Sequence, residues 1–203
     1  MKSIKSPVDA FHEVSRSRFI GYLIHIDSED EAKTRLEEIR NRYPDATHHV
    51  YAYVLGESGE IQKASDDGEP VRTAGFPVLD VLKKNGITDA LAVVVRYFGG
   101  IKLGAGGLIR AYSNTVRKLL ETADFSEKHT IDYYGLEVAY DQSKAIERFL
   151  AENALSVTPQ YGETVTYLFS VDACKDIDVF RTIDNLTGGR NHLEKTGSRK
   201  EYR

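Results

Sequence analysis

A run of cations without any acid is the part of the sequence best suited to chemistry. Between Ala90 and Leu120 the chain has no Asp or Glu, although its net charge is −4. Five cations fall in this stretch: Arg96, Lys102, Arg110, Arg117 and Lys118. Guanidinium and ammonium groups bind phosphate oxygens well. The sequence therefore predicts a local cationic patch on an otherwise acidic protein.

Glycines gather in the same stretch, at Gly99, Gly100, Gly104, Gly106 and Gly107. They follow a predicted buried strand and lead into a predicted helix. Clustered glycines let backbone N–H groups approach a ligand, and a helix N-terminus favours anions. The Walker motif is nevertheless incomplete, since Ala stands where it needs Lys, and no full Rossmann fingerprint occurs. A phosphate contact and a close-packed turn both explain these glycines.

The helix that follows the glycines has two distinct faces. Arg110, Asn114 and Arg117 recur at spacings of four and three, so they share one face. That face suits contacts with a phosphate backbone, and a solvated surface is the alternative. The opposite face is predicted to point inward, with Leu108, Tyr112, Thr115, Val116 and Leu119.

An acidic loop precedes this stretch and holds Asp66, Asp67 and Glu69. Three carboxylates this close can hold a hard cation or act in acid–base chemistry. The spacing does not fit an EF-hand loop. We favour a third interpretation, in which the acids pair with the nearby arginines and brace them.

Other reactive side chains give little support for catalysis. His48 and His49 are adjacent in a predicted strand, so they point to opposite faces and cannot easily share a metal. Cys174 has no partner motif and is interpreted as a structural thiol. No nucleophile elbow, HExxH or CxxC pair occurs. We expect no catalytic residue, no metal and no cofactor, and favour a protein that is not an enzyme.

Hydrophobic periodicity divides the chain into two α+β domains. Residues 1–125 contain predicted strands and helices that end with the cationic stretch. A polar connector is expected at Phe125–Thr130. Residues 131–203 give the order βαββαβ, which is that of a ferredoxin-like domain.

Composition indicates an ordinary globular protein, with 41% apolar and 29% charged residues. No apolar run is long enough to span a bilayer, and the polar Met1–Ser17 does not resemble a secretory signal. A single cysteine fits a reducing compartment. We expect a cytoplasmic location and no membrane contact.

Three segments together resemble the YigZ/IMPACT family. They are Ser65–Pro70, Thr73–Gly75 and Val95–Tyr112, with further similarity at Ser17–Ile20 and His48. The resemblance implies a first domain like the second domain of ribosomal small-subunit protein five. It also implies likeness to elongation factor G domains that meet RNA on the ribosome, and translational regulation in eukaryotic relatives. Arg72 and Val50 depart from the family pattern, which favours a small residue and a cysteine there.

These observations lead to one functional prediction with two alternatives. We expect a non-enzymatic RNA- or ribosome-associated factor that regulates translation. Arg96, Lys102, Arg110 and Arg117 are expected to contact phosphates, while Gly104, Gly106 and Gly107 shape the loop. An enzyme or sensor of a small phosphorylated ligand at this loop is the first alternative. A module that binds a protein partner is the second.

Overall fold

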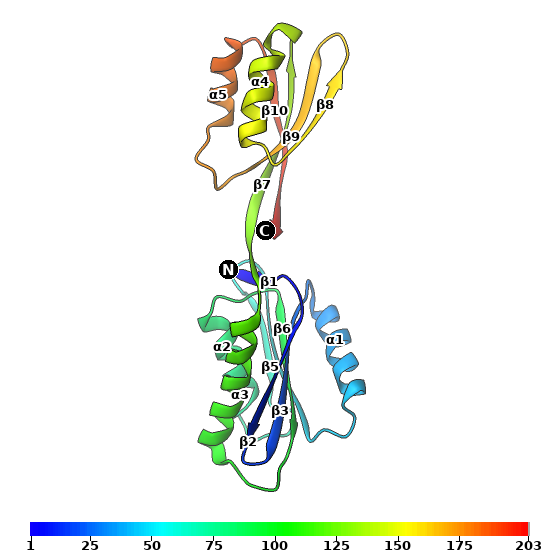
Figure 1. The fold of residues 1–203 in the computed structure, drawn as a ribbon, viewed down its shortest axis with the longest axis vertical. Helices are drawn as coiled ribbons and strands as arrows, with labels where there is room; N and C mark the ends of the chain where they lie inside the picture. The colour runs from blue at the N-terminus through cyan, green and yellow to red at the C-terminus, as the bar shows by residue number, and fades with distance from the viewer. Residues whose placement is uncertain (203) are drawn as a thin grey trace. The chain divides into compact units, whose positions relative to one another are not determined.

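The computed structural model describes residues 1–202, which form two compact units that meet in sequence between Glu127 and Lys128. Each unit has its own apolar core. The fold is α+β, as the sequence predicts (Figure 1). Among the described residues, no helix has the length and apolar character needed to span a bilayer.

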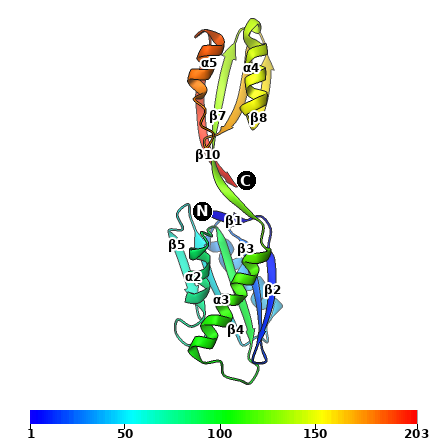
Figure 2. The same cartoon turned by 60° about the vertical axis from the view of Figure 1, so that its left-hand side comes forward.

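The first unit is built on an antiparallel sheet in the order β2-β3-β6-β4-β5. Its strands are β2 (Val8–Val14), β3 (Ser17–His25), β4 (His48–Leu55), β5 (Ile61–Ser65) and β6 (Ala90–Tyr97). Its helices are α1 (Glu29–Arg42), α2 (Gly75–Lys84) and α3 (Gly104–Thr122). Helix α1 covers one face of the sheet, and α2 and α3 cover the other (Figures 1 and 2).

The central strand β6 shows why both faces are covered. Leu91, Val93 and Val95 point to the core beneath α1, whereas Ala92 and Val94 point to the core beneath α2 and α3. All five are fully buried. Successive side chains of a strand point to opposite faces. A continuous apolar run therefore requires helices on both sides, as the sequence predicts.

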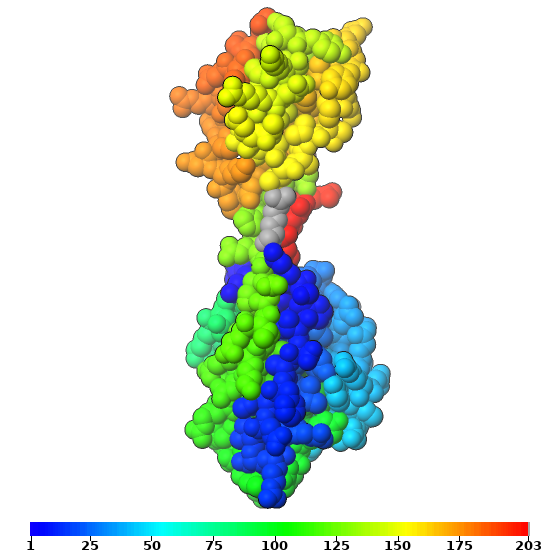
Figure 3. Space-filling model, in the orientation of Figure 1, coloured from blue at the N-terminus to red at the C-terminus, as the bar shows by residue number. Residues whose placement is uncertain are grey.

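Helix α3 lies beside the edge strand β2 (Figures 2 and 3), and its predicted inward residues are buried. The sequence does not reveal β2 because Met1–Ser17 is polar. Its half-buried residues alternate with exposed ones. Such alternation is typical of an edge strand with one face on a core.

The second unit has the ferredoxin-like order βαββαβ, in agreement with the sequence prediction. Its antiparallel strands lie in the order β10-β7-β9-β8. The elements are β7 (Phe125–Val138), α4 (Tyr140–Asn153), β8 (Ser156–Tyr161), β9 (Val165–Asp172), α5 (Val179–Thr187) and β10 (His192–Tyr202).

The predicted polar connector at Phe125–Thr130 is wrong, because these residues belong to strand β7. Residues Phe125–Glu127 pair with a short strand β1 (Lys2–Ile4), and pairing with β10 starts at Lys128. Backbone hydrogen bonds to two partners thus make a strand of a segment whose side chains are mostly polar.

Candidate functional site

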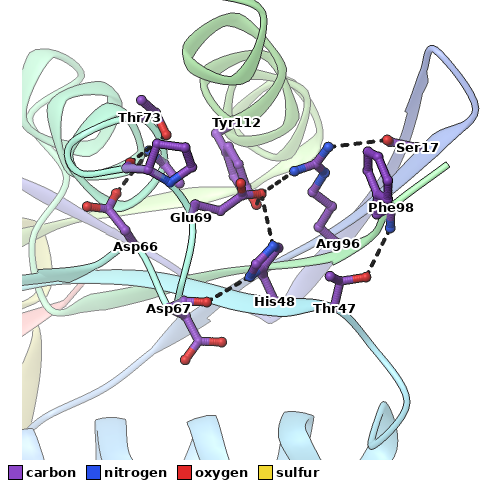
Figure 4. Close-up of polar contacts among 12 residues, drawn as sticks. Ser17, Thr47, His48, Asp66, Asp67, Glu69, Thr73, Arg96, Phe98 and Tyr112 are labelled. Carbon is purple, nitrogen blue, oxygen red and sulfur yellow. Dashed lines mark hydrogen bonds and ion pairs between the residues drawn. The ribbon is translucent and has the colours of Figure 1, made fainter. Parts of the chain in front are cut away.

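A buried carboxylate, Glu69, is the centre of the polar cluster in the first unit. Its Oε1 accepts hydrogen bonds from Arg96 Nη1 at 2.5 Å and from Tyr112 Oη at 2.7 Å. His48 Nε2 lies 3.7 Å from the same oxygen. These groups come from the loop after β5, from β6, from α3 and from β4, and converge on one point (Figure 4).

Strand register brings Arg96 into this cluster. It lies opposite Phe19 on β3 and opposite His48 on β4. Its guanidinium is 5.4 Å from the ring centroids of both Phe19 and Phe98. Its Nη2 donates to Ser17 Oγ at 3.4 Å, while its buried Nε has no partner within the described residues. Arg96 is only 4% exposed, so its charge depends on Glu69 for compensation.

Tyr112 stays protonated in this environment. Burial raises the pKa of its hydroxyl far above the ordinary value, and the Glu69 carboxylate raises it further. A protonated hydroxyl can donate a hydrogen bond. The inward-facing residue of α3 therefore supports the buried carboxylate as well as filling the core.

Asp66 has a structural role in the acidic loop. Its carboxylate accepts hydrogen bonds from the backbone N–H groups of Arg72, Ala74 and Gly75, at 2.7 to 3.0 Å. It thereby caps the N-terminus of α2. A Cβ at Gly75 would lie 2.5 Å from the carbonyl oxygen of Ser65, so the backbones are in close contact there. This packing fixes the loop that carries Glu69.

Asp67 links the loop to β4 and α1. Its carboxylate accepts the His49 N–H at 2.6 Å and lies 3.3 Å from Arg40 Nη2. Its carbonyl oxygen is 2.8 Å from His48 Nδ1. A carbonyl only accepts, so we assign the hydrogen to Nδ1. In the neutral ring, Nε2 is then the acceptor on the side of Glu69.

A pocket of about 430 Å³ opens beside the buried pair. Glu69, Arg96 and His48 line it together with Phe98, Lys102 and Gly104. Phe98 is 46% exposed, and its N–H donates to Thr47 Oγ1 at 3.0 Å. Within residues 1–202 the N-cap residue of α3, Leu103, makes no side-chain cap hydrogen bond, and the first turn has no acidic residue. The pocket therefore combines cations, an aromatic face and backbone donors.

Two of the predicted loop glycines lie in a helix instead. Gly104 has φ +69° at the start of α3, and Gly106 and Gly107 lie in its first turn rather than in the loop. The expected role of Gly106 and Gly107 in shaping the loop is therefore corrected. The close backbone contact occurs at Gly99, where a Cβ would lie 2.0 Å from the carbonyl carbon of Arg16.

The predicted cations divide into a buried one and three exposed ones. Arg96 is buried in its ion pair, whereas Lys102, Arg110 and Arg117 are exposed. Lys102 lines the pocket with Arg96, and Arg117 donates to Asn114 Oδ1 at 2.8 Å on the outer face of α3. Phosphate contact by these residues stays a prediction.

Sequence reasoning singled out neither Phe98 nor Thr47. Only the family resemblance drew attention to Ser17, and His48 was considered from the sequence only as a poor metal ligand. One signal was available: the hydroxyl of Tyr112 on an apolar helix face requires a buried hydrogen-bond partner. The remaining contacts depend on strand register, which the sequence does not reveal.

The fold and the pocket place the chain in one class of protein. It is an α+β protein whose first unit has a buried ion pair next to the N-terminus of α3, where the N-cap residue makes no side-chain hydrogen bond. Residues 15–120 match the family model of the Impact N-terminal domain. The chain belongs to the IMPACT family.

Relatives extend this similarity over both units. The IMPACT family member YvyE of Bacillus subtilis is 40% identical over 91% of this chain and 86% of its own. YigZ of Escherichia coli is 42% identical over 72% of this chain and 73% of its own. A solved structure titled "Crystal structure of an hypothetical protein" is 34% identical, covers 97% of both chains and has a TM-score of 0.62.

Proposed function

We propose that the chain is a non-enzymatic cytoplasmic factor that binds single-stranded RNA, free or on the ribosome, and regulates translation. One observation carries the proposal: the exposed ring of Phe98 and the exposed Lys102 line the same pocket as the uncapped first turn of α3. Proteins bind single strands by stacking bases on aromatic rings and by contacting phosphates with cations.

The support of Phe98 suits a stacking platform. Thr47 holds its backbone, and the buried guanidinium of Arg96 lies near its ring. We therefore assign Arg96 a supporting role, because its charge is already paired with Glu69. A nucleobase stacked on Phe98 would place its phosphate near Lys102 and the N–H groups of α3.

The outer face of α3 extends the cationic surface away from the pocket. Arg110 and Arg117 are exposed there, and the segment from Ala90 to Leu120 contains no acid. A row of cations along a helix suits several successive phosphates better than one small ligand. The family resemblance, which implies domains that meet RNA, agrees with this arrangement.

The test is RNA binding at several salt concentrations by the wild type and by the triple variant Lys102→Gln, Arg110→Gln, Arg117→Gln. Each lost contact with single-stranded RNA lowers the slope of log affinity against log salt by about 0.7. The triple variant should therefore lose about 2 from the slope. Phe98→Ala should weaken binding by about 1–3 kcal/mol and leave the slope unchanged.

A matched control removes three exposed lysines elsewhere: Lys63, Lys83 and Lys144, each replaced by Gln. It should bind RNA as the wild type does. If the first triple variant keeps wild-type affinity and slope, the assigned surface is wrong. If the wild type shows no salt-sensitive binding to RNA or ribosomes, the RNA proposal itself fails.

A small phosphorylated ligand is a second candidate, which the His48 tautomer favours. With the hydrogen on Nδ1, the neutral ring offers Nε2 as an acceptor or base beside the pocket. The pocket volume is also within the usual range for small ligands. This candidate would be supported if nucleoside mono- or diphosphates raised the melting temperature of the wild type but not of His48→Ala. The wild type should then also fail to bind RNA.

A further inference from the structure

An imidazole, a carboxylate and a thiol lie close together in the second unit, whereas the pocket described above lies in the first unit. His129 lies on β7, Asp172 ends β9, and Cys174 follows two residues later. Their donor atoms all lie within 4.8 Å of one another. We propose that His129, Asp172 and Cys174 form a binding site for one divalent transition-metal ion of the zinc class.

Backbone pairing places the three residues with little freedom. Asp172 lies opposite Ile131 in the β7–β9 ladder, and the Ala173 N–H donates to the Thr130 carbonyl at 2.8 Å. The turn after β9 therefore passes close to His129. Asp172 Oδ1 accepts the Cys174 N–H at 2.9 Å, which holds the cysteine backbone against the carboxylate.

The side chains already converge on the Asp172 carboxylate. Its Oδ2 lies 2.8 Å from His129 Nδ1. Zn–N and Zn–S bonds of about 2.0 and 2.3 Å place two donors of a tetrahedral site roughly 3.5 Å apart. Side-chain rotations can bring donors within 4.8 Å of one another to that spacing. The site therefore requires no change of strand pairing.

The donor set selects the class of metal. Thiolate and imidazole suit zinc and cobalt, whereas magnesium and calcium prefer oxygen donors alone. Binding replaces the Cys174 S–H bond with an Sγ–metal bond, and the proton leaves to solvent. Without the metal, His129 Nδ1 donates to Asp172 Oδ2. Coordination through Nδ1 replaces this hydrogen bond with an N–metal bond, and the neutral ring then carries its hydrogen on Nε2. Three protein donors leave a fourth position for water.

Cobalt(II) titration of the reduced, chelator-treated full chain tests the site. We expect one equivalent to bind, with the near-ultraviolet charge-transfer absorption of a thiolate–cobalt bond, and zinc to displace it. Competition with a zinc indicator then compares variants. Cys174→Ser, His129→Gln and Asp172→Asn should each weaken zinc binding by at least about tenfold, because even supporting partners of ligands cost that much.

His192→Gln is the matched control, since His192 is an exposed histidine of β10 opposite Glu137. It should bind zinc as the wild type does. Cys174 is exposed, so Cys174→Ser should keep the wild-type melting temperature and report on binding alone. The proposal is overturned if the wild type gives no thiolate–cobalt absorption. It is equally overturned if Cys174→Ser binds zinc with wild-type affinity.

Discussion

Ion pairs are arranged very differently in the two units. In the first, the Arg96 and Glu69 side chains are 5% and 3% exposed. In the second, the pair of Asp132 and Lys195 is less buried, with side chains 14% and 40% exposed. Burial of both charges incurs a large desolvation cost, whereas an exposed pair incurs little and contributes little. The first unit therefore contains a buried pair in which each charge depends on the other for compensation.

The buried pair of the first unit also lines the pocket. Arg96 lies near the ring of Phe98, and Glu69 holds Arg96 in place. Loss of the carboxylate would disturb the pocket and the stability together. Loss of the partly exposed pair in the second unit should have a smaller effect.

The largest expected effect is that of Glu69→Gln. It leaves the buried Arg96 charge uncompensated, so the first unit should lose about 3–5 kcal/mol of unfolding free energy. Asp132→Asn in the second unit should cost at most about 1 kcal/mol. Hydrogen exchange of the β6 and β9 amides in urea measures each unit separately. If the two variants lost equal unfolding free energy, the Glu69–Arg96 pair would be no more important for stability than the Asp132–Lys195 pair.

A smaller effect is expected from Gly99→Ala. Its Cβ would overlap the Arg16 carbonyl carbon at 2.0 Å, and moving two backbones apart should cost about 1–3 kcal/mol. Gly197→Ala on β10 is the control, because an added Cβ meets no described atom within 4 Å. It should change stability by less than about 0.5 kcal/mol. Thermal melts of both variants decide whether the backbone contact matters.

The smallest effect should have the opposite sign. Gly106 lies in the first turn of α3, and the nearest atom to an added Cβ is Arg110 Nη1 at 3.9 Å. Gly106→Ala should therefore raise the unfolding free energy by about 0.5–1 kcal/mol. Gly104→Ala should lower it by about 1–2 kcal/mol, because φ is +69° there. If Gly106→Ala lowered the unfolding free energy instead, Gly106 would need the backbone freedom of a loop residue and the helical interpretation would be wrong.

Helices and buried strands were predictable because their apolar periods are strong, as in β6 and α3. The edge strand β2 was not, because polar residues interrupt its apolar ones even though its partner β3 follows directly in sequence. The start of β7 was not, because its side chains are mostly polar and its partners β1 and β10 are distant in sequence. Pairing of the acids with arginines was a reasonable prediction from charge alone. The sequence could not distinguish Asp66 as a helix cap from Glu69 as the partner of Arg96, because both assignments depend on how the loop folds back.

The hydrogen bonds of Asp66 have a consequence for the order of folding. They span only six to nine residues, whereas the Glu69–Arg96 pair spans 27. A loop of about ten residues closes in roughly 10–100 ns, and longer closures lose more chain entropy. The turn can therefore form while β6 is still unpaired. We therefore expect the loop that carries Glu69 to form early, and the pairing of Arg96 in the sheet to complete the site later.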